Sequence, residues 1–141
     1  MSVSALAEGL RPVVLRLGRR LRREADQVGL SSLDATLLAM VGKHQGIGVS
    51  ELADLERTSR PTMSNHVKRL EAAALIARRP PERDRRRVGL VLTPKGARAI
   101  EVLRRRRTDW LAERLAALSD EQREAIRRAM EPLGQLAAMD R

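Results

Sequence analysis

The stretch that decides the fold covers residues 50–79 and reads SELADLERTSRPTMSNHVKRLEAAALIARR. Ser50 is the candidate cap of a short helix. Thr58 and Ser59 are candidate caps of a second helix, and Pro61 stands in its first turn, where a missing N–H is tolerated. A short helix, a tight turn and a second helix predict a helix-turn-helix.

The second helix of this stretch has two contrasting sides. Apolar side chains fall on one side at helical spacing, and they are Met63, Val67, Leu70 and Ala74. The other side is polar, and its first two turns carry no acid. Ser, Thr and Asn can bond phosphates or base edges, and Lys and Arg neutralise phosphate. The residues predicted to face DNA from this helix are Arg60, Pro61, Thr62, Ser64, Asn65, Lys68 and Arg69. Taken alone, this pattern fits an ordinary solvated helix face equally well.

A basic hairpin is predicted directly after this helix. Residues 75–78 and 88–93 predict two strands, and Val88, Leu90 and Leu92 alternate along the second. Residues 78–87 hold six arginines against two acids, a net charge of +4, whereas residues 117–141 carry a net charge of −1. Such segregation is not explained by a general excess of arginine. It favours a wing that meets DNA, because narrow minor grooves attract arginine.

The remaining elements are helices, so the fold class is mainly α with a small β-hairpin wing, in the order α-α-α-α-β-β-α-α. In the first helix, Pro12 predicts either a kink or a true start near Arg11. At the start of the second, Ser31 and Asp34 resemble a capping box with Asp in place of Glu or Gln. Helical spacing and capping residues predict these helices at 4–26, 32–44, 94–117 and 120–138.

The composition sets further bounds. The chain has 141 residues, a formal net charge of +10, no cysteine, and Trp110 as its one Phe, Tyr or Trp residue. The charge favours a polyanionic partner, nucleic acid first. We find no membrane-spanning run and no signal peptide, so a cytoplasmic protein is expected. His44 and His66 make a weak case for a metal site, and no catalytic motif is present, so we expect no metal, no cofactor and no enzymatic activity.

In their order and spacing, these features resemble the MarR family of bacterial winged helix-turn-helix repressors. Residues 50–79 resemble the family's helix-turn-helix and first wing strand. Residues 83–96, RDRRRVGLVLTPKG, resemble its wing signature, in which Asp, any residue and Arg precede an apolar strand, Leu-Thr and Gly. Ala74 departs from the family, which commonly has Gly there. Since Ala in a left-handed conformation costs about 1 kcal/mol, we expect the helix to continue slightly further before the strand.

The resemblance implies a homodimer built from the first helix and the last two, a recognition helix in the major groove, and a wing arginine in the minor groove. By match to the signature, Asp84 is the wing aspartate and Arg86 the wing arginine, with Arg85 and Arg87 as further candidate DNA contacts. The Asp84 carboxylate can orient Arg86 through a charge-assisted hydrogen bond. The implied regions are an N-terminal dimerisation helix (1–30), a winged helix-turn-helix domain (31–96) and C-terminal dimerisation helices (97–141).

The favoured function is a sequence-specific, double-stranded DNA-binding transcriptional regulator, a repressor by resemblance, that binds a pseudo-palindromic operator as a homodimer. Many family members bind aromatic effectors, so a small-molecule effector is a candidate partner, although Trp110 alone could stack on it. The lack of cysteine excludes a thiol switch. Two alternatives stay open: a basic architectural or RNA-associated protein that binds by charge, and a dimeric protein-interaction adaptor.

Overall fold

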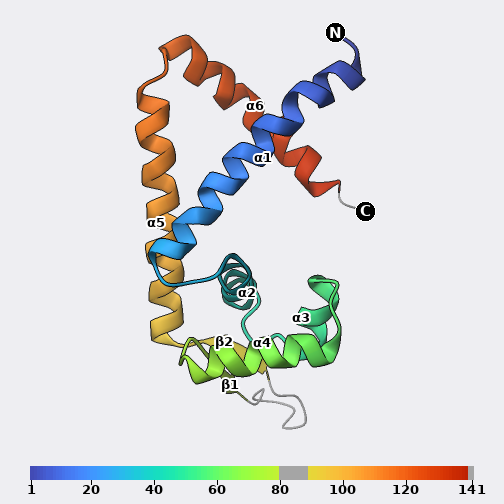
Figure 1. Cartoon of the computed structure of the whole chain (residues 1–141), viewed down its shortest axis with the longest axis vertical. Helices are drawn as coiled ribbons and strands as arrows, with labels where there is room; N and C mark the ends of the chain where they lie inside the picture. Colours follow the sequence, from blue (N-terminus) through green and yellow to red (C-terminus); the bar gives the residue numbers. More distant parts are fainter. Residues whose placement is uncertain (80–88, 140–141) are drawn as a thin grey trace. The chain divides into compact units, whose positions relative to one another are not determined.

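The computed structural model describes residues 1–79 and 89–139 of the chain. The described residues form six helices and one two-stranded antiparallel sheet, in the predicted order (Figure 1). The chain divides into two compact units, Met1–Arg105 and Arg106–Arg141. The first unit contains the helix-turn-helix and the hairpin.

The first two helices are α1 (Val3–Gln27) and α2 (Ser32–Lys43). Helix α1 is capped by Ser2 and runs through Pro12, so a start near Arg11 is wrong. After its C-cap Val28, Gly29 adopts φ +75°, and the N–H of Leu30 donates to the Ala25 carbonyl. This is a Schellman motif, whose left-handed residue glycine adopts without strain.

The helix-turn-helix consists of α3 (Val49–Leu55) and α4 (Arg60–Ala72). Helix α3 is capped by Gly48, so the prediction that Ser50 caps it is wrong. Ile47 forms an isolated bridge with Leu90, which holds the backbone extended until the helix begins. Ser59 caps α4 as predicted, and its hydroxyl accepts from the N–H of Thr62.

Helix α4 also ends in a Schellman motif, and here the left-handed residue is Ala74. The N–H of Ala74 donates to the Glu71 carbonyl, and the N–H of Leu75 donates to the Leu70 carbonyl. Ala74 has φ +60° and is exposed. The expectation that the helix continues past this position, with Ala74 on its buried face, is therefore wrong. Buried Leu70 and Leu75 accompany the motif, as its usual hydrophobic contact requires.

The sheet pairs β1 (Ile76–Arg79) with β2 (Gly89–Leu92). Leu90 is fully buried, and its backbone bonds the loop before α3 in both directions, from Gly46 and to Ile47. A side chain on Gly89 would lie 2.5 Å from the Gly46 carbonyl oxygen, so only glycine allows this close approach. The hairpin is thus fixed at its base to the domain core.

The last two helices are α5 (Pro94–Ala116) and α6 (Asp120–Ala138). The predicted capping box of α6 is present, with Ser119 and Gln122 each bonding the other's backbone. In this unit, Arg123 donates to the Leu115 carbonyl and pairs with Asp120, which ties the start of α6 to the end of α5.

One aliphatic core holds the first unit together. Helix α2 crosses its centre, as its nearly all-apolar sequence indicates, and contacts both α1 and β2. The largest fully buried side chains are Leu37, Leu38, Val41, Leu52, Met63, Val67, Leu70, Leu90 and Leu103. Because these residues come from α2 to α5, the helix-turn-helix and the hairpin share one rigid base.

Candidate nucleic-acid interface

Helix α4 presents the side that the sequence predicts. Met63, Val67 and Leu70 are buried in the core, which confirms three of the four predicted inward positions. The helix lies beside α3 and the hairpin in the first unit (Figure 1). Its outer side therefore belongs to the same end of the unit as the base of the wing.

The seven predicted contact residues of α4 lie together on this outer side. Six of them are exposed and Ser64 is half-buried. Thr62 takes part in the helix cap, because its hydroxyl oxygen accepts from Ser59 at 2.8 Å, and its own O–H can still donate outward. No acidic residue occurs in the first turn of the helix. The surface offers hydrogen-bond donors and positive charge, which match phosphate and base edges.

The turn between α3 and α4 is stabilised by a third Schellman motif. Arg57 adopts φ +52°, and the N–H of Thr58 donates to the Ala53 carbonyl at 3.0 Å. A left-handed arginine is strained by about 1 kcal/mol, and the paired backbone groups offset that cost. This turn sets the angle between the two helices.

Arg69 forms an ion pair with the first turn of α2. Its Nη1 donates to Asp34 Oδ2 at 2.7 Å, and its Nη2 lies 2.9 Å from His66 Nδ1. The hydrogen bond to Asp34 raises the pKa of the Arg69 guanidinium above its ordinary value. The Ser31 hydroxyl accepts from the Asp34 N–H as predicted, but the Asp34 carboxylate bonds Arg69 rather than returning to Ser31. The second half of the predicted capping box is therefore replaced by a contact between helices.

Two further contacts fix the wing, one to α4 and one to the loop between α2 and α3. Glu71 in the last turn of the helix accepts from Arg78 Nε of β1 at 2.9 Å. The N–H of Leu92 in β2 donates to the Gln45 side chain at 3.2 Å. Arg79 follows Arg78 and is exposed at the end of β1. The wing residues Asp84, Arg85, Arg86 and Arg87 lie outside the described residues.

The start of α5 caps the end of α4. The Thr93 hydroxyl donates to the Ala74 carbonyl at 2.6 Å and accepts from the Gly96 N–H at 3.0 Å. Lys95 Nζ donates to the Ala73 carbonyl at 2.9 Å. These bonds satisfy carbonyl groups that a helix leaves without partners at its C-terminus. Both ends of α4 are thereby held in position.

Several of these residues are absent from the sequence prediction. Asp34, Gln45 and Glu71 position the interface through partners that are 35, 47 and 7 residues away. Helical spacing identifies neighbours within one helix and cannot pair two helices, so the pattern marks Asp34 only as a capping residue and gives no signal of its contact with Arg69. The absence of acids from the first turn of α4 was accessible to pattern reasoning because it depends on α4 alone.

Two other kinds of feature were sought among the described residues, a metal site and a membrane-spanning helix. No cluster of three or more His, Asp or Glu side chains is placed to hold a metal ion in residues 1–79 and 89–139. Over the same ranges, none of the helices combines the length and the apolar character that crossing a bilayer requires.

A helix-turn-helix followed by an antiparallel hairpin, with a polar outer side whose first turn carries no acid, defines a winged helix-turn-helix protein. The comparisons with known proteins agree. The MarR family model matches residues 30–88. An uncharacterised helix-turn-helix transcriptional regulator of Mycobacterium bovis is 34% identical over 130 residues, which cover 91% of this chain and 90% of that protein. The chain belongs to the MarR family of transcriptional regulators.

Solved structures share the fold over nearly the whole chain. A MarR family protein from Bacillus stearothermophilus superposes with a TM-score of 0.81 at 27% identity, covering 96% of this chain and 95% of that one. A mutant of Staphylococcus aureus MepR bound to an oligodeoxyribonucleotide superposes with a TM-score of 0.71 at 20% identity, covering 99% of each chain.

Proposed function

We propose that this protein is a sequence-specific transcriptional repressor that binds a pseudo-palindromic site in double-stranded DNA as a homodimer. One observation carries the proposal: α4 combines a fully buried apolar side with an outer side of donors and cations that is free of acid in its first turn. In a helix-turn-helix, the N-terminal part of the second helix enters the major groove. The DNA-bound MepR mutant, which has this fold, is consistent with that use.

The wing supplies the second part of the proposed interface. Its strands are fixed to α4 by the Glu71–Arg78 ion pair and to the core by Leu90. We assign Arg86 to the minor groove and Asp84 to its orientation, with Arg85 and Arg87 at the adjacent phosphates. This assignment rests on the sequence of the signature and on the family to which the chain belongs.

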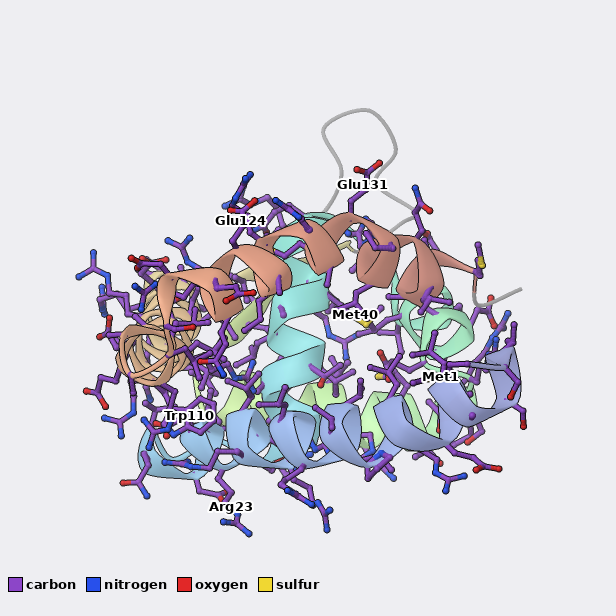
Figure 2. The ribbon with its side chains drawn as sticks, turned by 90° about the horizontal axis from the view of Figure 1, so that it is seen from above. Met1, Arg23, Met40, Trp110, Glu124 and Glu131 are labelled. Atoms are coloured by element: carbon purple, nitrogen blue, oxygen red, sulfur yellow. The ribbon has the colours of Figure 1, made fainter. Side chains whose placement is uncertain are left out.

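The apolar stripes of α1 and α6 support a dimer. On α1, five residues of one helical stripe are more than 40% exposed: Val3, Leu6, Val13, Val14 and Leu17. None of the described residues of α6 is buried, and its apolar side leaves Ile126, Met130, Leu133 and Leu136 exposed. Glu124 and Glu131 lie on the side of α6 opposite to this apolar stripe and point outward (Figure 2). A second copy that covers these stripes would remove large apolar areas from water.

We also propose, from the properties of the family, that the protein represses transcription and that a small molecule releases it from DNA. Release by a ligand would act by favouring a dimer geometry in which the two α4 helices no longer match successive major grooves. The aromatic side chain available to such a ligand is Trp110, which is partly buried on α5. The centroid of its ring lies 4.2 Å from the Arg114 guanidinium carbon.

Selection from a random duplex library tests the proposal most directly. We expect enriched sites with two-fold symmetry, bound at physiological salt far more tightly than random duplex. Equal affinity for the selected and random duplexes would favour the architectural alternative. Failure to bind any duplex would favour the protein-interaction adaptor.

A further inference from the structure

We infer that Asp34 is a positioning residue for DNA binding, which holds the Arg69 guanidinium in the direction in which it meets DNA. The inference rests on the proposed function and adds to it a residue of α2 that does not itself face the groove. Its basis is the link between the first turn of α2 and the third turn of α4, 35 residues apart in the chain.

The two partners of this link differ in exposure. The Asp34 side chain is 13% exposed, whereas that of Arg69 is 51% exposed. Asp34 is fixed in the fold, since its N–H bonds the Ser31 cap and its carboxylate lies in the first turn of α2, where the helix dipole favours negative charge. The carboxylate therefore belongs to the scaffold, and the guanidinium is presented at the surface.

The guanidinium is held from two sides. Nη1 bonds Asp34 and Nη2 bonds His66, which lies one turn earlier on α4. A guanidinium has five N–H donors in a rigid plane, so these two contacts fix the plane and leave other donors for DNA. An arginine that is already ordered loses less rotamer freedom on binding than a mobile one.

Stability alone gives little reason for this contact. An ion pair with one half-exposed partner contributes little to the stability of the fold. One Asp34 oxygen, Oδ1, is also buried without a hydrogen-bond partner among the described residues, which is unfavourable for a carboxylate. The Asp34–Arg69 ion pair is better explained by the orientation that it gives to the Arg69 guanidinium.

The sign of one mutational effect separates the possible roles. Removing an acid from a DNA-binding surface should raise affinity for DNA, because one repulsive charge is lost. If Asp34 instead orients Arg69, Asp34→Ala should lower affinity. Asp54→Ala is the matched control, since Asp54 is an exposed acid on α3 and its loss changes the net charge equally.

The experiment measures affinity for the selected duplex at physiological salt in a double-mutant cycle of Asp34→Ala and Arg69→Ala, below the melting temperature of every variant. We expect Asp34→Ala to weaken binding roughly three- to tenfold, and to have no further effect in the Arg69→Ala background. Asp54→Ala should leave affinity unchanged or slightly higher.

Two results would overturn the inference while leaving the proposed function intact. In one, Asp34→Ala raises affinity as a simple charge effect or by freeing a sequestered Arg69. In the other, it weakens binding by the same factor with and without Arg69, as a general structural role would. If the wild-type protein binds selected and random duplexes equally, the proposed function fails, and this inference fails with it.

Discussion

At the scale of single residues, the positions that decide the geometry are those where the backbone adopts a left-handed conformation or two backbones approach closely. Gly29, Arg57 and Ala74 have positive φ values and each ends a helix. Glycine occupies one of these positions, arginine occupies the one in the turn between α3 and α4, and alanine occupies the one that follows α4. These two positions therefore carry strain that glycine would relieve.

Ala74→Gly should stabilise the protein by about 0.5–1 kcal/mol, because relief of the left-handed strain exceeds the added entropy of the unfolded chain. The measurement is the free energy of unfolding by urea at a fixed protein concentration. Ala73→Gly is the control, since Ala73 has φ −79° and gains nothing in the folded state. Stabilisation by both variants would contradict the assignment of strain to Ala74.

Gly96→Ala should destabilise the protein by about 2–3 kcal/mol. A side-chain carbon there would lie 2.0 Å from the Leu75 carbonyl oxygen, a backbone atom that cannot rotate away. Ala97→Ser adds one atom at the next, exposed position and should change stability by only a few tenths of a kcal/mol. Urea unfolding of both variants at one concentration gives the comparison. A Gly96→Ala variant as stable as the wild type would show that residue 96 and the Leu75 carbonyl are not in close contact.

At the scale of elements, the sequence predicts the type and order of every described helix and strand. It does so because capping residues and apolar spacing act within one element, as Ser59 and Ser119 illustrate. Its errors occur where another element decides. Gly48, not Ser50, caps α3 because Ile47 pairs with Leu90 of β2. The contact of Asp34 with Arg69 likewise depends on how α2 crosses α4, which no local pattern contains.

Asn65→Ala in the recognition helix should flatten base preference at one position in each half-site, with a loss of about 1–3 kcal/mol of discrimination against the wrong base. Lys68→Ala, on the same exposed side, should weaken binding to all sequences uniformly. It should also lower the slope of the logarithm of affinity against the logarithm of salt concentration by about one. Binding to duplexes substituted at each position, at two salt concentrations, separates the two effects. If the base preference of Asn65→Ala matches that of the wild type, Asn65 does not contact a base.

Arg86→Ala in the wing should weaken operator binding several-fold with an unchanged melting temperature, because one arginine is lost from the minor groove. Arg128→Ala removes the same charge from the exposed surface of α6, where Arg128 pairs with Glu124. Competition binding against the selected duplex compares them. An equal loss from Arg128→Ala would mean that net charge, rather than the wing, determines the effect of Arg86.

At the scale of the whole molecule, the most basic segment and the exposed apolar stripe of α6 lie in different parts of the chain. The basic excess is concentrated in residues 78–87, whereas residues 117–141 are slightly acidic. The exposed apolar stripe of α6 is continuous over three turns and has acids on its opposite side, as Glu124 and Glu131 show (Figure 2). A slightly acidic helix with an apolar stripe suits contact with another protein surface better than contact with DNA.

Met130→Glu should convert the proposed dimer into a monomer, because it places a carboxylate in the centre of the apolar stripe, where Met130 is 66% exposed in the single chain. Glu131→Gln, at an exposed position on the opposite side of α6, should leave the dimer intact. Molar mass from light scattering over a range of concentrations distinguishes the two. Tight binding to a two-fold symmetric site requires that both half-sites are bound together. The monomer should therefore bind the selected duplex weakly, although its α4 and wing remain folded. A Met130→Glu protein that stays dimeric would place the interface elsewhere.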